Sequence, residues 1–279
     1  MSAPVSLAGR AVALAWALAA PLGAQAVSAT RTVEGKVQLA EAKGPVAVPN
    51  AWVVLHRVGT DRSAPLDSMR ANARGDFHFR YTPSGSADAI YFVSTTFRGI
   101  AYFSSPLRDI AVRGGDADLL VYDTTTTTSK LGVAGRHVVV SAPRNGRREV
   151  AEIFEISNDG IRTVVPRDSA SPLWATHFPE KAESLTVAPG DLSAGAVAFL
   201  EGRGEVFAPI SPGVRQLVVT YRLPVGAFPL AIPAERPIGV LEVLLEEPRS
   251  VVDGAGLSET PGAEIDGRRF RRFLARDVG

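Results

Sequence analysis

The chain has 279 residues, of which 46% are hydrophobic and 21% charged, so its composition is that of a globular protein and excludes a disordered or fibrous one. Its 30 Lys and Arg residues balance 29 Asp and Glu residues, which gives no reason to expect nucleic acid or an anionic membrane as a partner. The sequence has no cysteine, which excludes disulfides, thiol catalysis and thiolate metal sites.

The first 26 residues have the layout of a secretory signal peptide. One positive charge, Arg10, precedes an apolar run at 11–24, and Ala24-Gln25-Ala26 supplies the small residues that signal peptidase accepts. The run is shorter than the about 20 residues that a membrane span needs. We therefore expect export to the periplasm, the outer envelope or the medium, with cleavage after Ala26; a retained anchor is the alternative. No later segment is apolar enough to predict a transmembrane helix.

From residue 32 onward, hydrophobic and polar residues alternate with period two, which predicts β-strands. In Asp76-Phe77-His78-Phe79-Arg80-Tyr81, the three aromatic rings share one face and the polar side chains share the other. Gly, Pro, Asn and Asp separate such runs at the short spacing of an all-β sandwich. The sequence predicts a first β-sandwich over 30–122, with strands that include 33–39, 51–58, 90–96, 100–104 and 119–122.

Three of these stretches carry a resemblance to a known family. They are a G-x-V strand in Val33-Glu34-Gly35-Lys36-Val37, a P-x-A-x-V-x-L strand that begins at Pro49, and a G-x-F-x-F strand in Gly75-Asp76-Phe77-His78-Phe79. In this order they resemble the carboxypeptidase regulatory-like domain, a transthyretin-like sandwich. The resemblance implies an accessory module of exported bacterial proteins that serves folding, spacing or ligand contact, and it does not imply peptidase activity.

A run of threonines at 124–128 offers little apolar surface and favours extended backbone, so it predicts a linker or edge strand over 123–135. A second β-sandwich is predicted over 136–279, which makes the expected fold all-β with two tandem sandwiches. A hairpin is expected around Asn158-Asp159-Gly160, because Asn and Gly tolerate the backbone of tight turns. The predicted strands of this half are 148–156, 161–165, 197–200, 205–210, 215–223 and 238–245.

The final run, 270–279, predicts an edge strand that is open to a partner strand. The arginines in and before it are expected either to contact an acidic envelope partner or phospholipid, or to blunt the edge against aggregation. The partner-binding candidates in this run are Arg268, Arg269, Phe270, Arg271 and Arg272.

No motif in the sequence predicts catalysis. The four histidines, His56, His78, His137 and His177, lack the spacing of zinc sites, and there is no nucleophile elbow, P-loop or dinucleotide fingerprint. We therefore expect no catalytic residue and no cofactor. An enzyme would require at least two of these histidines to meet a carboxylate within hydrogen-bond distance.

Two further sets of side chains are candidates for binding. One would form an aromatic platform for a glycan if its rings are exposed, whereas a spacer would bury them in its core; its members are Trp52, Trp174, Tyr91 and Tyr102. The other gathers carboxylates near the joint between the sandwiches, where they would either bind calcium or form a solvated turn; its members are Asp116, Asp118 and Asp123.

These observations predict an exported, non-enzymatic protein of the cell envelope. In this interpretation the second sandwich carries a surface for a ligand, an envelope protein or a glycan, and the first is a rigid spacer. A carbohydrate-binding module is the alternative, and an envelope enzyme is the second alternative.

Overall fold

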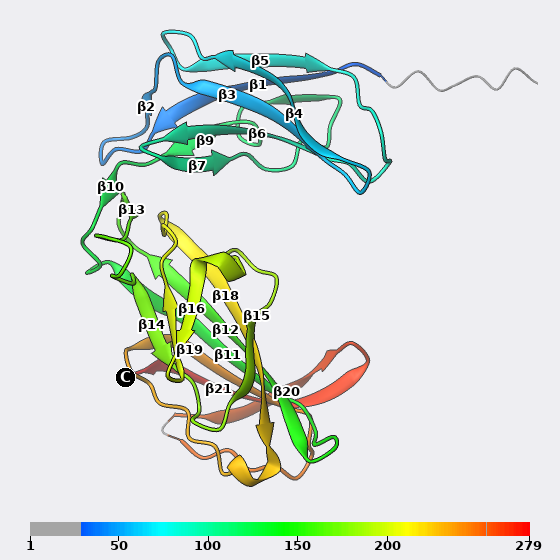
Figure 1. The fold of residues 1–279 in the computed structure, drawn as a ribbon, viewed down its shortest axis with the longest axis vertical. Coiled ribbons are helices and arrows are strands. Elements are labelled where there is room, and N and C mark those ends of the chain that lie inside the picture. The colour runs from blue at the N-terminus through cyan, green and yellow to red at the C-terminus, as the bar shows by residue number, and fades with distance from the viewer. Residues whose placement is uncertain (1–28, 255) are drawn as a thin grey trace, which may run out of the picture.

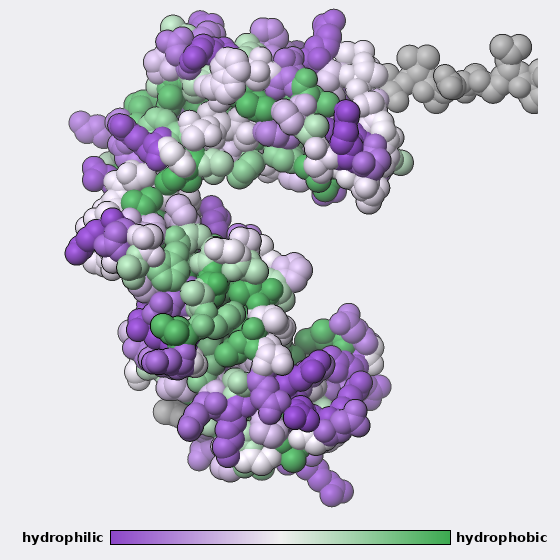
Figure 2. Space-filling view, in the orientation of Figure 1, coloured by the Kyte–Doolittle hydropathy of each residue, from purple (hydrophilic) through white to green (hydrophobic). Residues whose placement is uncertain are grey.

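The computed structural model describes residues 29–254 and 256–279, so the expected signal peptide lies outside the described residues. Within them the chain is all-β, as predicted, and its helical elements are two single turns, η1 (Ala194–Ala196) and η2 (Val225–Ala227). Neither turn is long enough to cross a membrane. The strands form two domains that are joined at one side and separated by an open hollow at the other (Figures 1 and 2).

The first domain packs two sheets face to face (Figure 1). In one sheet, β1 pairs antiparallel with β2 and β5 and parallel with β8 and β9; the other sheet has the order β4-β3-β6-β7. The strands are β1 (Arg31–Leu39), β2 (Val46–Ala47), β3 (Trp52–Val58), β4 (Ser63–Arg70), β5 (Asp76–Tyr81), β6 (Ile90–Phe97), β7 (Ile100–Phe103), β8 (Ala111–Arg113) and β9 (Leu119–Val121).

The alternation predicted for β5 is confirmed, because Phe77, Phe79 and Tyr81 are buried and their neighbours are not. Gly35 shows why one of the sequence motifs requires glycine. A Cβ at this position would lie 2.7 Å from the ring of Phe77 and 2.8 Å from the carbonyl oxygen of Ala117. The close approach of β1 to its neighbours therefore depends on the missing side chain.

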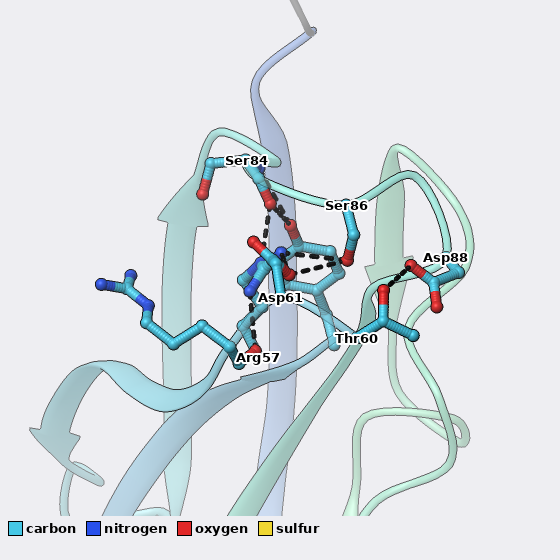
Figure 3. A network of polar contacts seen from close by, with 8 residues as sticks. Arg57, Thr60, Asp61, Ser84, Ser86 and Asp88 are labelled. Atoms are coloured by element: carbon cyan, nitrogen blue, oxygen red, sulfur yellow. Dashed lines mark hydrogen bonds and ion pairs between the residues drawn. The ribbon is translucent and has the colours of Figure 1, made fainter.

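One buried arginine ties together the loops at one end of the first domain (Figure 3). Arg57 donates from Nε to the carbonyl of Ser84 at 2.7 Å and from Nη1 to the carbonyl of Arg62 at 2.8 Å. Its Nη2 donates to Asp61 at 2.6 Å, and Ser86 donates to the same carboxylate at 2.7 Å. These bonds from Arg57 and Ser86 lower the pKa of Asp61.

The second domain is built on a seven-stranded sheet with the order β15-β18-β12-β11-β19-β21-β20, and a three-stranded sheet, β14-β17-β16, covers part of one face. Its strands are β11 (Leu131–Val140), β12 (Arg147–Asn158), β14 (Trp174–His177), β15 (Glu183–Val187), β16 (Val197–Leu200), β17 (Arg203–Val206), β18 (Gly213–Pro224), β19 (Ile238–Leu245), β20 (Ser258–Ile265) and β21 (Arg268–Val278); β10 (Thr124–Thr125) and β13 (Thr163–Val164) form a separate parallel pair.

The hairpin predicted around Asn158-Asp159-Gly160 is wrong. Strand β12 pairs with β11 and β18, whereas the segment after the turn pairs through β13 with β10. The reason is the buried side chain of Asn158, whose amide donates to the carbonyls of Arg162 and Ile210 at 2.8 Å each. These bonds direct the chain away from β12. Strand β11 also begins at Leu131, inside the segment that the sequence predicted as a linker.

A chain of hydroxyl groups joins the two domains beside the β10–β13 pair. Tyr102 of β7 lies 2.9 Å from the hydroxyl of Thr163, which lies 3.2 Å from the hydroxyl of Ser211. Tyr102 also donates to the carbonyl of Tyr122 at 3.3 Å. Since Tyr102 belongs to the first domain and Thr163 and Ser211 follow β11 and β12 of the second, the joint is held by side chains as well as by backbone.

The core of the second domain contains a buried ion pair. Arg136 donates from Nε and Nη2 to one oxygen of Glu152 at 2.8 and 2.6 Å, and Tyr221 donates to the other oxygen at 2.5 Å. The guanidinium group also donates to the carbonyl of Pro233 at 2.8 Å and lies over the ring of Phe154. Burial and the adjacent Glu152 carboxylate raise the pKa of Tyr221.

Candidate ligand-binding site

Two irregular segments cover the part of the long sheet that the three-stranded sheet leaves open. They are residues 228–237, between η2 and β19, and the described residues between β19 and β20, which are 246–254 and 256–257. Each brings partly buried apolar side chains against the sheet, namely Phe228, Leu230 and Ile232 from the first and Val252 and Leu257 from the second. Long connections without regular structure are a frequent location of binding sites.

A pocket of about 800 Å³ lies between these segments and the sheet. Its floor consists of aliphatic side chains of β11 and β19, and its walls are the apolar side chains of the two segments. Its volume is within the range of sites that bind small molecules. The apolar lining residues are Val140, Phe228, Pro229, Leu230, Ala231, Ile232, Leu241, Val243, Leu245, Val251, Val252, Leu257 and Val278.

Polar groups border this apolar pocket at one end. Arg148 donates from Nη2 to Glu247 and from Nη1 to the carbonyl of Ser141 at 3.1 Å. Its Nε is buried and has no hydrogen-bond partner, and its guanidinium group lies 5.0 Å from the ring centre of Phe228. The hydrogen bond from Arg148 lowers the pKa of Glu247, so this carboxylate is ionised at neutral pH. Ser250, which donates to Glu247 at 3.3 Å, completes the polar end, and Asp253 is a further lining residue of the pocket.

Three of the four aromatic candidates are core residues. Trp174, Tyr91 and Tyr102 expose only 3%, 4% and 7% of their surface, whereas Trp52 is 50% exposed. Trp174 packs on Phe154, and Tyr102 belongs to the joint between the domains. The three buried rings therefore cannot form the exposed platform that a glycan would need.

Trp52 instead belongs to an exposed aromatic face on the outer side of the sheet β4-β3-β6-β7. Phe103 is exposed on the same face, and the ring of Phe92 stacks on His56 at 5.0 Å. The Nε2 of His56 lies 2.7 Å from the hydroxyl of Ser94, and partial burial lowers the pKa of this histidine. Sequence reasoning missed this pair because β3 and β6 are distant in the chain and only their register brings the residues together.

The histidine requirement for an enzyme is met at two other positions. His137 Nδ1 lies 2.5 Å from Glu242, and His177 Nδ1 lies 2.6 Å from Glu235. In the part of the chain that the structure describes, no side-chain hydroxyl group is hydrogen-bonded to either histidine, so neither pair includes the hydroxyl member of a Ser–His–carboxylate triad. Histidine–carboxylate pairs alone do not define a catalytic site.

The calcium candidates are not assembled into a site. Asp118 accepts a hydrogen bond from the backbone of Lys36 at 2.8 Å, and Asp123 pairs with Arg98 at 3.3 Å. Among residues 29–254 and 256–279, no group of three or more acidic or histidine side chains could hold a metal ion. Asp116 and Asp118 lie in the turn that precedes β9, as in the alternative of a solvated turn.

The prediction that the last strand is an edge is wrong, because β21 pairs with β19 on one side and β20 on the other. Phe270 is buried, and the arginines around it pair with carboxylates of the same sheet. Arg271 forms two bonds of 2.8 Å with Glu259. Arg268 pairs with Glu246, and Arg272 pairs with Glu242, whereas Arg269 is exposed. The paired arginines therefore stabilise the sheet and leave little positive charge for a partner.

The chain matches no known family description and no curated protein. Solved structures that match part of the chain include the M1 zinc metallopeptidase from Deinococcus radiodurans, with 14% identity, a TM-score of 0.32, and coverage of 53% of this chain and 39% of that chain. A mutant of that enzyme bound to a Tyr-Ser-Ala substrate gives 14% identity, a TM-score of 0.31, and coverage of 52% and 39%. The match thus spans about two fifths of those enzymes, and likeness at this level carries no information about activity.

Proposed function

We propose that this chain is an exported, non-enzymatic protein of the cell envelope whose second domain binds an apolar or amphipathic small molecule in the apolar pocket. The observation that carries the proposal is the pocket of about 800 Å³ with an aliphatic floor. Most of its lining residues are apolar, and removing apolar surface from water on binding is favourable in proportion to the area buried. An apolar or amphipathic ligand would gain this contribution.

The first domain is proposed as a carboxypeptidase regulatory-like module that acts as a rigid spacer. The supporting observation is the joint, where Tyr102, Thr163 and Ser211 form a hydroxyl chain next to the β10–β13 pair. Such a joint fixes the orientation of the pocket relative to the first domain. Export itself stays a prediction from the sequence.

A series of alkyl alcohols tests the proposal. Since each buried methylene contributes about 0.8 kcal/mol, affinity should rise about fourfold for each added carbon from octan-1-ol to dodecan-1-ol. Isothermal titration of the chain without its leader measures this slope. Val243→Phe should weaken binding, because its larger ring would project from the floor into the pocket.

The matched control is Val139→Phe, which places the same ring on β11 but away from the pocket, and it should leave the slope unchanged. Affinities independent of chain length, or equal loss in both variants, would contradict the proposal.

Carbohydrate binding is a second candidate, supported by the exposed aromatic face around Trp52 rather than by the residues that the sequence pointed to. A Trp174→Phe variant leaves Trp52 as the tryptophan reporter of the described residues. Quenching of its emission by soluble peptidoglycan fragments, and no quenching by alkyl alcohols, would support this candidate.

The enzyme alternative is supported only by the two histidine–carboxylate pairs.

A further inference from the structure

We infer that the apolar pocket selects single-chain amphiphiles with an uncharged, hydrogen-bonding head group and discriminates against fatty-acid anions. This inference rests on the proposed function and specifies the class of ligand. It is carried by the ion pair of Arg148 with Glu247 at the polar end of the pocket, whereas the apolar lining alone would accept any alkyl chain.

The charges at the polar end disfavour an anionic head group. One cation, Arg148, and two carboxylates, Glu247 and Asp253, border the pocket. Glu247 already neutralises Arg148 through a direct ion pair. A ligand carboxylate at this end would lose hydration, would find Arg148 already paired, and would lie close to the negative charge of Glu247.

The same pair also disfavours a purely hydrocarbon ligand. Arg148 and Glu247 both line the pocket, so a hydrocarbon at this end would remove water from an ion pair without replacing its hydrogen bonds. The terminal nitrogens Nη1 and Nη2 of Arg148 each carry two N–H groups, and one on each donates to Ser141 and Glu247 respectively. An oxygen atom of an alcohol, ester or amide would accept from a second terminal N–H without adding charge.

A hydroxyl head group has a further partner. The hydroxyl group can donate a hydrogen bond to a carboxylate. Arg148 lowers the pKa of Glu247 and so keeps this carboxylate ionised, and Ser250 already donates one hydrogen bond to it at 3.3 Å. An alcohol can therefore accept from the guanidinium group and donate to the carboxylate at the same time. A carboxylate ligand can only accept, and an alkylammonium ligand can only donate.

The test compares dodecan-1-ol, dodecanoate and dodecylammonium, which share a chain and differ in the head group, by isothermal titration into the chain without its leader below their aggregation limits. We expect dodecan-1-ol to bind at least about tenfold tighter than dodecanoate, because a like charge within about 6 Å shifts an ionisation equilibrium by one to three powers of ten. Added salt should narrow this ratio.

Glu247→Gln should tighten dodecanoate binding by about tenfold, since it removes one negative charge and frees Arg148. Glu183→Gln is the matched control, because Glu183 pairs with the neighbouring Arg147 away from the pocket, and it should leave the ratio unchanged. If Glu247→Gln does not fold, the ratio in the unmodified chain and its salt dependence decide the question.

Equal or tighter binding of dodecanoate would overturn the head-group inference while leaving the proposed function intact. Tightest binding of dodecylammonium would overturn it in favour of a cationic head group. If none of the three amphiphiles binds, the proposed function fails, and the inference fails with it.

Discussion

The two domains cover their sheets differently, and the difference explains why the apolar pocket lies in the second domain. In the first domain two sheets of similar extent face each other, and their facing side chains, such as Val33, Val53 and Leu55, are fully buried. In the second domain a three-stranded sheet is too small to cover seven strands, and two irregular segments close the remainder over a pocket. A mismatch in sheet size leaves volume that a ligand can occupy.

Each domain also contains one fully buried arginine, used in different ways. Arg57 and Arg136 expose 2% and 4% of their side chains, but their carboxylate partners, Asp61 and Glu152, expose 44% and 1%. Arg57 therefore fastens surface loops, whereas Arg136 is half of an ion pair within the core.

The described part of the chain has one tryptophan in each domain, Trp52 and Trp174, so fluorescence reports the two domains separately.

The largest effect is expected from Glu152→Gln. Removing the charge leaves Arg136 uncompensated in the core, which should destabilise the second domain by about 3–5 kcal/mol. Urea unfolding followed through Trp174, in a Trp52→Phe background, measures the change. The control is Glu155→Gln, on the more exposed side of β12, which should lower the free energy of unfolding by less than about 1 kcal/mol. An equal loss in both variants would show that burial of the Arg136–Glu152 pair does not raise its contribution to stability.

An intermediate effect is expected from two leucine truncations in the second domain. Leu217→Ala, in the enclosed part of the core, should cost about 2–5 kcal/mol. Leu241→Ala should cost less, because Leu241 borders the apolar pocket and already lacks neighbours on that side. The same unfolding measurement compares them. A larger loss at Leu241 would mean that the pocket is closed in solution.

The smallest effect concerns pH and the first domain. Because Arg57 and Ser86 lower the pKa of folded Asp61, this group adds stability above its unfolded pKa of about 3.9, and that stability is lost as the pH falls through the folded pKa. Asp61→Asn should therefore lower the midpoint of the Trp52 transition at neutral pH, and the gap to the unmodified chain should close in acid. If the difference between the two midpoints were the same at neutral and at acid pH, the ionisation of Asp61 would not be its source.

Much of the fold follows from local patterns. Strands β5 and β18 alternate so regularly that their buried faces were predictable, and the glycine of the G-x-V motif marks a close approach of strands. Strand β20 was not predictable, since its sequence contains Pro261 and Gly262 and its residues are at most partly buried. It is a strand because β21 offers it a partner, with a register shift at the Pro-Gly pair.

The candidate site was less predictable than the fold. Arg148 and Glu247 are 99 residues apart, and their pairing depends on β11, which lies between β12 and β19 in the sheet. Residues 228–237 contain three prolines and no periodic pattern, so nothing in the sequence indicates that they cover a sheet. The aromatic residues that sequence reasoning favoured are large, and large rings are used in both cores and binding faces.

The joint between the domains has a mechanical consequence. Tension that separates the domains would act on the parallel β10–β13 pair, on the bond between the amide of Thr163 and the carbonyl of Asp123, and on the contact of Tyr102 with Thr163. These bonds lie together, so they share the load instead of breaking one after another. A force that pulls the domains apart is therefore resisted by several bonds at once.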